Sequence, residues 1–331
     1  MRQPLLLVSL YPIALLVLSA VHALWPQRDG PLALSQIFAP HLFLPLVLLL
    51  PLALVRGARL LRLALSAAAI VALVRFGPGV LSLPVAETPG ATRIAVATWN
   101  VEAGQGRVEA LADAVPQPDG SPAGALVGLQ ELSPDQADAI LADPALQERF
   151  PYRILEPHGN VLGMGLLSSY PILDQGSSFA PAHIWALLDL GAGRTLRVVN
   201  GHPMPATIST ARGLPYDYDP VVRDQSIAFL RGLAEPALQR GEPVLMLGDY
   251  NVTDREPAYV ELTTGLADAH REVGLGPGST WRPEALERLP FGVLRIDYLL
   301  ASPELRPLNV SSDCTPRGSD HCLVNALLEL P

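Results

Sequence analysis

The stretch "PVLMLGDYNVTD", Pro243–Asp254, joins a short apolar run to a group of polar residues. Val244–Leu247 is typical of a buried strand. Asp249 and Asn251 follow Gly248, and alternate side chains of a strand point to the same face. The stretch therefore predicts a buried strand whose end holds a carboxylate and a carboxamide on one side. Taken alone, it is equally typical of a turn, because Asp and Asn bond their own backbone.

The same pattern of an apolar strand followed by polar residues recurs along the chain. The recurrences are Asn100 and Glu102 in "IAVATWNVE", Glu131 in "ALVGLQEL", Asn200 and His202 in "RVVNGHP", Asp297 in "RIDYLLAS", and Asp320 and His321 in "GSDHCLV". A single such residue is ordinarily a solvated loop residue. Six groups together favour one shared site, because ligand sites gather where strand ends converge.

The residue types in these groups select a chemistry. Oxygen ligands without Cys–His clusters suit Mg²⁺ or Mn²⁺. The sequence has no glycine-rich phosphate loop, serine nucleophile elbow or dinucleotide fingerprint. The pattern therefore predicts hydrolysis of a phosphoester by direct attack of water, with a divalent cation stabilising charge on the phosphoryl group.

The order of strands and helices predicts an α/β fold with mixed sheets. Predicted strands are 93–99, 125–130, 162–167, 184–190, 195–200, 244–247, 294–301 and 323–330, and predicted helices are 107–115, 134–141 and 220–233. Strands 184–190 and 195–200 are close enough to form a hairpin. Ser133 is expected to cap the helix that begins at Pro134.

Residues 1–76 are predicted to form a membrane region with about three helices. The apolar stretches are Leu5–Leu24, His41–Val55 and Leu63–Val74. Residues 1–89 hold six arginines and two acids, and three of those arginines, at 56, 59 and 62, lie in one short connection. Positive loops stay inside, so the part after residue 76 is expected outside the cytoplasm. Leu5–Ala23 also fits a cleaved signal peptide, which leaves the same topology.

Residues 77–91 are rich in Pro and Gly and predict a linker before a domain that spans residues 92–331. This domain holds 17 arginines against 30 acids, and the chain contains no lysine. Its two cysteines, Cys314 and Cys322, flank a polar loop. They would pair outside the cytoplasm, and two buried free thiols are equally compatible with the sequence.

The ordered motifs "TWNVE", "LQEL", "GMGLLSSYPI", "NGHPMP", "LGDYNVTD", "STWRP", "RIDYLLAS" and "GSDHCLV" resemble the endonuclease/exonuclease/phosphatase superfamily. The superfamily includes DNase I, exonuclease III-type repair nucleases and bacterial sphingomyelinases. The resemblance covers about residues 92–331, and it extends to a bacterial branch in which such a domain follows transmembrane helices. It implies a four-layer α/β sandwich, with two mixed sheets packed face to face and helices outside.

The resemblance also implies roles for individual residues. Glu131, Asn100 and Asp320 would contact the metal, Mg²⁺ or alternatively Mn²⁺. Asp249, Asn251, His321, Asp297 and His202 would be catalytic, with Asp249 and His321 jointly moving protons and Asp297 fixing the tautomer of His321. Asn100, Asn200, Asn251 and His321 would bind the phosphate.

Three positions depart from the family pattern. Glu102 stands where repair nucleases have Asp, and Ser169 stands where relatives often have Arg. Tyr170 replaces the Glu that orients a second histidine in DNase I, which weakens the case for His202 as an acid. The segment Met204–Asp219 has no counterpart in the family motifs, and no exposed aromatic hairpin of the bilayer-inserting kind is evident in the sequence.

The sequence therefore predicts a membrane-anchored, divalent-metal-dependent phosphoesterase that hydrolyses a phosphodiester in a nuclease-like manner. The acidic balance of the domain is a weak argument against duplex DNA, whose partners usually display basic surface. A lipid phosphoesterase, similar to sphingomyelinases or phosphoinositide phosphatases, is the alternative. A non-catalytic binding module on the same fold is the other class. The expected partners are the phosphoester substrate and, through the N-terminal helices, the bilayer of a bacterial cell membrane; no protein partner is indicated.

Overall fold

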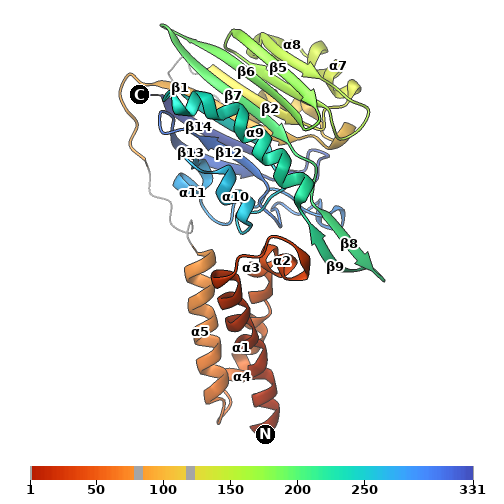
Figure 1. Cartoon of the computed structure of the whole chain (residues 1–331), viewed down its shortest axis with the longest axis vertical. Helices are drawn as coiled ribbons and strands as arrows, with labels where there is room; N and C mark the ends of the chain where they lie inside the picture. The colour runs from red at the N-terminus through yellow and green to blue at the C-terminus, as the bar shows by residue number, and fades with distance from the viewer. Residues whose placement is uncertain (1, 78–84, 117–123, 331) are drawn as a thin grey trace. The chain divides into compact units, whose positions relative to one another are not determined.

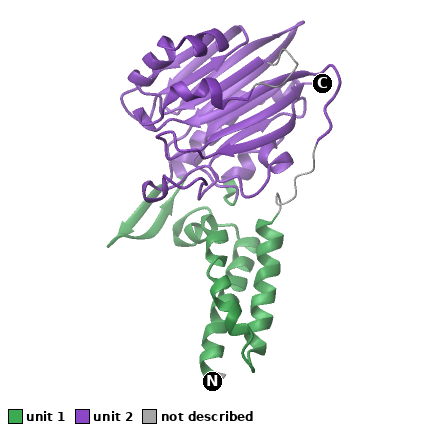
Figure 2. Ribbon diagram, turned by 180° about the vertical axis from the view of Figure 1, so that it is seen from behind, with its two compact units in different colours: residues 1–80, 207–220, 255–257 green, residues 81–206, 221–254, 258–331 purple. Residues whose placement is uncertain are grey.

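The chain divides into two compact units. The computed structural model describes residues 2–77, 85–116 and 124–330. The first unit, here called the helical unit, comprises residues 1–80, 207–220 and 255–257 (Figure 2). The second, here called the α/β unit, comprises residues 81–206, 221–254 and 258–331. Each unit is described separately below.

The first sheet of the α/β unit is mixed and has six strands in the order β13-β14-β1-β2-β4-β3. Strand β1 runs parallel to β2 and antiparallel to β14, the strand nearest the C-terminus. The strands are β1 (Thr92–Asn100), β2 (Gly124–Gln130), β3 (Tyr152–Glu156), β4 (Met164–Ser168), β13 (Arg306–Asp313) and β14 (Leu323–Leu330).

The second sheet is also mixed and has six strands in the order β11-β12-β10-β7-β6-β5. Strand β10 runs parallel to β7 and antiparallel to β12, which places Asp249 opposite Asp297. The strands are β5 (Ile172–Phe179), β6 (Ala182–Gly191), β7 (Arg194–His202), β10 (Val244–Asp249), β11 (Ala267–Asp268) and β12 (Asp297–Ala301).

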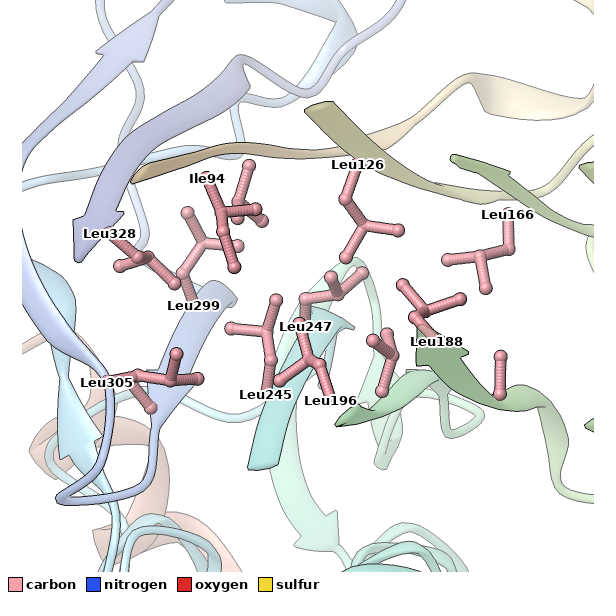
Figure 3. Packing of buried hydrophobic residues seen from close by; sticks show 14 of the residues in the cluster. Ile94, Leu126, Leu166, Leu188, Leu196, Leu245, Leu247, Leu299, Leu305 and Leu328 are labelled. Atoms are coloured by element: carbon pink, nitrogen blue, oxygen red, sulfur yellow. The ribbon is translucent and has the colours of Figure 1, made fainter. Parts of the chain in front are cut away.

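Apolar side chains from both sheets fill the space between them (Figure 3). Ile94 and Leu126 of the first sheet join Leu245, Leu247 and Leu299 of the second, and all five are at most 2% exposed. Alternate residues of β10 point away from this core and pack against helices, so both faces of the strand are buried. This two-sided burial explains the continuous apolar run that precedes Asp249.

Helices cover the outer face of each sheet and complete four layers (Figure 1). Those against the first sheet are α6 (Leu111–Ala114), α7 (Pro134–Ala142) and α8 (Pro144–Arg149). Those against the second are α9 (Val221–Gln239) and α10 (Pro257–Leu262), and α11 (Ala269–Val273) follows β11. Short 3₁₀ turns are η1 (Glu102–Gly104), η2 (Val108–Ala110) and η3 (Glu284–Leu286). The predicted four-layer α/β sandwich is confirmed.

The eight predicted strands correspond to β1, β2, β4, β6, β7, β10, β12 and β14, and β6 and β7 form the expected hairpin. Ser133 caps α7 as predicted, accepting a 3.2 Å hydrogen bond from the Gln136 amide. The prediction of one helix over 107–115 was wrong, because η2 and α6 share this segment. The remaining strands were not predicted, since edge strands such as β5 are mostly polar and half exposed.

The helical unit holds the N-terminal helices and a two-stranded hairpin. The helices are α1 (Arg2–Leu24), α2 (Gly30–Ile37), α3 (Ala39–Phe43), α4 (Leu46–Ala53) and α5 (Arg59–Phe76), and the hairpin strands are β8 (Thr207–Ala211) and β9 (Leu214–Asp219). Helices α1, α3, α4 and α5 share a small apolar cluster that includes Leu15, Phe43 and Leu61. Leucines on their other faces are largely exposed, which is the distribution expected of helices that face lipid.

Of the described helices, Gln3–Leu24 is long and apolar enough by itself to cross a membrane or to serve as a signal sequence. The segments Gly30–Ile37 and Ala39–Ala53 together match one broken span, bent by 71°. The predicted second span lies in α3 and α4, and the third lies within α5, whose arginines keep it from meeting the same criterion. Residues 78–84 of the predicted linker lie outside the described residues. The three-span topology stays a prediction.

Candidate active site

The polar residues singled out in the sequence gather at one edge of the sandwich. Asn100 ends β1, His202 ends β7 and Asp249 ends β10, while Asp297 begins the antiparallel strand β12. Carboxyl ends of the parallel strands and the start of their antiparallel neighbour therefore meet at this edge. Buried strands hold the side chains on rigid backbone, as catalytic groups require.

Asn100 links the acids of the two sheets. Its amino group donates to Glu131 Oε1 at 3.0 Å and to Asp249 Oδ2 at 3.1 Å. Its oxygen accepts from the Glu102 amide at 3.0 Å. In this arrangement Asn100 orients the two carboxylates. Its assignment as a metal and phosphate ligand stays a prediction.

Glu131 follows β2 with a φ of 57°, in the left-handed region that non-glycine residues seldom occupy. Such backbone strain costs on the order of 1–3 kcal/mol and persists where the surroundings enforce it. Burial raises the pKa of the Glu131 carboxyl, and the nearby His202 and Asn100 oppose that shift. A carboxylate held in this position attracts a cation.

His202 lies between Glu131 and Asp249. Its Nδ1 contacts the Val161 carbonyl at 3.1 Å, which places the proton on Nδ1. Its Nε2 is 3.7 Å from Glu131 Oε1 and 3.6 Å from Asp249 Oδ2. Burial alone would lower the pKa of His202, but the hydrogen bond and charge of Asp249 raise it.

Tyr170 plays no part in holding His202. Its hydroxyl accepts from the Gly124 amide at 3.0 Å, at the start of β2, whereas Glu131 follows the end of that strand. Ser169 Oγ likewise accepts from the Ala125 amide at 2.7 Å. Both departures from the family pattern therefore join β2 to the segment after β4. A backbone carbonyl orients His202 instead.

His321 and Asp297 form a closely bonded pair. His321 Nδ1 lies 2.9 Å from Asp297 Oδ2, and its Nε2 lies 3.7 Å from Asp249 Oδ2. Burial would lower the pKa of His321, but the charges of Asp297 and Asp249 raise it to about 10. Its imidazole is therefore protonated at neutral pH, with Nε2–H directed toward Asp249.

Asp249 stays ionised although it is buried. Burial acts to raise its pKa, but His321 and His202 lower it below the ordinary value. Its Oδ1 accepts from the Asn251 amide at 2.9 Å, and the Asn251 side chain donates to the Pro203 carbonyl at 3.0 Å. Asn251 thus fixes Asp249 through its backbone and ties the loop after β10 to the loop after β7.

Gly248 allows a close approach, and the structure identifies what approaches. Its φ is 137°, and a Cβ at this position would lie 2.0 Å from the carbonyl oxygen of Gly201. The two glycines are register partners in β10 and β7. The close approach is therefore to the neighbouring strand of the same sheet. It sets the spacing between His202 and Asp249.

Asp320 lies beside His321, with Oδ1 3.8 Å from Nε2. The Trp281 indole donates to Asp320 Oδ2 at 2.8 Å, and the Asp320 amide donates to Glu102 Oε2 at 2.7 Å. Glu102 therefore holds the Asp320 loop through its side chain. Thr280, which precedes Trp281, accepts through Oγ1 from the Asp297 amide at 3.2 Å.

Arg282 lies in the motif "STWRP", and the sequence did not indicate a role for it. This arginine is 1% exposed and donates to the carbonyls of Cys314 and Ser319 at 3.0 and 3.1 Å. Cys314 and Cys322 form a disulfide, which settles the pairing that the sequence left open. The disulfide and Arg282 together close the loop that presents Asp320 and His321.

Asn200 does not join the group of acids and histidines. Its amide donates to the carbonyls of Leu129 and Gly165 at 3.1 and 2.9 Å, and its oxygen accepts from Gln130 at 2.6 Å. It is fully buried and bridges the two sheets. Its assignment to phosphate binding stays a prediction, and these contacts favour a structural role.

The residues present fit a divalent cation. Asp249, Asp297 and His321 each offer a potential ligand atom within 4.8 Å of one another, but His321 is protonated and bonded to Asp297, so the carboxylates are the ligands available to a cation. Asp297 Oδ1 is buried and has no hydrogen-bond partner among the described residues. Within that part of the chain, no arginine forms an ion pair with Glu131, Asp249 or Asp297. Oxygen-rich sites of this kind suit Mg²⁺ or Mn²⁺.

The layered fold and its edge site define the class of DNase I-like α/β sandwiches. The chain belongs to the endonuclease/exonuclease/phosphatase family, whose model matches residues 97–321. Enzymes of this family are phosphoesterases and nucleases and are generally divalent-metal dependent. No curated protein sequence matches the chain.

Solved structures of the family share the fold at low identity. A Neisseria 3′ phosphatase bound to a product DNA hairpin is 20% identical over 70% of this chain and 98% of its own, with a TM-score of 0.53. A mannosyl-6-phosphatase from Bacteroides thetaiotaomicron is 16% identical over 71% of this chain and 99% of its own, with a TM-score of 0.52. A family protein from the same organism is 15% identical, covering 73% and 99%, with a TM-score of 0.52.

Proposed function

We propose that the chain hydrolyses a phosphodiester by attack of water, with Mg²⁺ or Mn²⁺ as cofactor, while its N-terminal helices hold it in a membrane. The observation that carries this proposal is the set of buried carboxylates and histidines at one sandwich edge. Glu131, Asp249 and Asp297 lie there without an arginine partner in the described part of the chain. The family and its related structures support the reaction class.

Each residue has a role that its surroundings support. Asp249, ionised at neutral pH, orients the attacking water and accepts its proton together with His202. Protonated His321, held by Asp297, binds the phosphate and holds the proton that reaches the leaving oxygen. Glu131 and Asp320 would hold a divalent cation, which would supply stabilisation of charge on the phosphoryl oxygens.

The membrane placement rests on two sequence features and one structural feature. Gln3–Leu24 is a candidate span, and the arginines at 56, 59 and 62 favour a cytoplasmic loop. The disulfide between Cys314 and Cys322 fits an oxidising compartment. We therefore place the α/β unit outside the cytoplasm of a bacterial cell.

The proposal is tested with the full chain in detergent and a chromogenic phosphodiester, bis(p-nitrophenyl) phosphate. Turnover is expected with Mg²⁺ or Mn²⁺ and not with EDTA. Glu131→Gln removes a charge at the site, and Glu148→Gln on the exposed face of α8 is the matched control. Equal turnover of the two variants, or turnover that survives EDTA, contradicts the mechanism.

A substrate panel then separates nuclease from lipid phosphoesterase. Plasmid DNA, RNA, sphingomyelin and phosphoinositides are each offered at equal phosphate concentration. Relatives are described with DNA and with a sugar phosphate, so the fold alone favours none of them. Binding of a substrate without metal-dependent turnover would instead indicate a non-catalytic binding module.

A further inference from the structure

The hairpin β8–β9 follows the site strand β7 in the chain. Its turn is Arg212-Gly213, with φ values of 52° and 77°. Two consecutive positive φ values are the signature of the tight type I′ turn that suits twisted strands. Ala211 pairs with Leu214 across this turn. The hairpin is therefore well defined locally, although the sequence had not indicated one here.

The hairpin exposes large apolar side chains. Ile208, Leu214 and Tyr216 are 49%, 72% and 56% exposed. From residue 204 to residue 216 the only charged residue is Arg212, at the turn. A two-stranded hairpin buries too little surface to be stable alone in water. Contiguous exposed apolar side chains mark a contact surface.

The neighbours of the hairpin belong to the helical unit. Strand β9 packs against α2 (Figure 2). Tyr218 bonds to Glu256, and Gln36 of α2 donates to the Arg255 carbonyl at 2.6 Å. The same unit contains α1, the candidate membrane span, which ends six residues before α2 begins. The hairpin is thus part of the unit whose helices carry the apolar, membrane-type surface.

The chemistry of the tip fits a lipid surface. Tyrosine is favoured at membrane interfaces, aliphatic side chains enter the acyl boundary, and arginine binds anionic headgroups. The acids of the hairpin, Asp217 and Asp219, lie farther from the turn than Leu214 and Tyr216. We propose that the tip of the hairpin, formed by Arg212, Leu214 and Tyr216, inserts into the surface of the bilayer that anchors the chain.

This contact identifies the substrate class, given the proposed function. The hairpin begins five residues after His202, a chain length of at most about 18 Å. The end of β7 is therefore tied to an element that touches lipid. The substrate that this arrangement suits is a phosphoester carried by a membrane lipid, with its headgroup in the interface.

The contact is tested on the full chain in lipid nanodiscs. The sequence has two cysteines, both in the disulfide, so one introduced cysteine is the only free thiol. An environment-sensitive nitrobenzoxadiazole label is attached to Leu214→Cys and, as control, to Leu275→Cys on the α/β unit, which is 70% exposed. A blue-shifted emission that doxyl lipids quench is expected at 214 and not at 275. Equal, unquenched emission at both positions overturns the proposal. An emission shift at position 214 that depends only on the number of protein molecules per nanodisc also overturns it, because it indicates contact with a second copy of the chain.

The substrate class is tested by a rate ratio. A diacylglycerol p-nitrophenyl phosphodiester in the nanodisc is compared with soluble bis(p-nitrophenyl) phosphate. The double variant Leu214→Asp/Tyr216→Asp is expected to lower turnover of the lipid ester at least tenfold and to leave turnover of the soluble ester unchanged. The control variant Leu275→Asp is expected to leave turnover of both esters unchanged. An unchanged ratio overturns the lipid assignment. Absence of turnover on both esters in the wild type contradicts the proposed function, while the label position still reports the contact.

Discussion

Two buried polar clusters in the α/β unit differ in how their charge is balanced. In the first, Arg295 pairs with Asp268 at 2.7 Å and Asp254 at 3.1 Å, and Tyr259 donates to Asp268 at 2.6 Å. Here an arginine neutralises carboxylates within the protein. Burial would lower the pKa of Arg295, yet Asp268 and its other neighbours raise it well above its usual range.

The second cluster is the candidate site, where Glu131, Asp249 and Asp297 face His202 and His321 and no arginine of the described residues pairs with them. Its cations are histidines, whose charge depends on protons, and Glu131 has a backbone φ of 57° that non-glycine residues seldom adopt. Comparison of the two clusters shows that the chain can neutralise buried acids when only stability is at stake. The unbalanced cluster is therefore the one that we propose to bind an external cation and a phosphate.

The largest expected effect is a loss of turnover caused by a substitution in the candidate site. Asp249→Asn keeps the shape of the side chain and removes its charge, so turnover of a phosphodiester should fall on the order of 10²–10⁴-fold. The free energy of unfolding should change far less than turnover, and should fall rather than rise, because the lowered pKa of Asp249 means that its ionised form stabilises the folded protein at neutral pH. Initial rates and chemical denaturation measure the two quantities. A destabilised variant with normal turnover would assign Asp249 to structure.

The opposite result is expected in the balanced cluster. Arg295→Met leaves Asp254 and Asp268 without their shared partner, which should cost about 3–5 kcal/mol of unfolding free energy. Arg288→Met, an exposed arginine in the loop after η3, is the control. Denaturation midpoints measure both. Losses of equal size would mean that burial does not distinguish the two arginines.

The disulfide is expected to contribute an intermediate amount. Cys314→Ala/Cys322→Ala opens a short loop, which should cost about 2–3 kcal/mol. Turnover should fall as well, because Asp320 and His321 lie inside this loop. The Arg282 contacts to the loop remain in the variant and should preserve part of the activity. Thermal unfolding and rates with and without a thiol reductant check this, and unchanged values in both would contradict it.

Metal binding should raise the stability of the folded protein only when the candidate site is intact. A cation at ten times its dissociation constant adds about 1.4 kcal/mol to a native state that alone binds it. Mg²⁺ or Mn²⁺ should therefore raise the Tm of the wild type and not that of Glu131→Gln. Arg288→Met should respond as the wild type does. Equal shifts in all three proteins would indicate that the cation binds elsewhere.

The smallest effect is expected at a partly buried ion pair, Arg317–Asp313. Burial alone would raise the pKa of Asp313, but hydrogen bonds from Arg317 and Thr315 lower it to about 2, from 3.8. Its contribution is therefore complete above pH 3.8 and is lost as pH falls toward 2. Because Asp313 is 33% exposed, Asp313→Asn should cost only a few tenths of a kcal/mol at pH 7 and nothing at pH 2. Denaturation at both pH values tests this.

Strand periodicity predicted the central strands and most of the site, because side chains at i and i+2 share a face. The same rule does not tell how deep a residue lies within the sandwich. Asn200 and His202 do share a face of β7, but Asn200 lies deeper between the sheets, where its amide satisfies backbone carbonyls. Whether a side chain lies in the core or at the edge of the sandwich depends on its position along the strand, and the alternation of side chains does not reveal that position.

The supporting residues were harder to predict because their partners are distant in sequence. Arg282 bonds the carbonyls of Cys314 and Ser319, more than 30 residues away. The hairpin β8–β9 escaped notice because its strands mix Thr, Ser and Pro with few apolar residues. In both cases the structural role depends on contacts with residues distant in sequence rather than on a local sequence pattern.

The pairing of β1 with β14 also orders events during biosynthesis. The edge of β1 stays open until residues 323–330 have left the ribosome, and His321 joins Asn100 only then. At roughly 5–20 residues per second, the interval between the two spans tens of seconds. During that time one edge of β1 stays open and the site is incomplete, so a chaperone that shields this edge would protect the chain until β14 pairs with it.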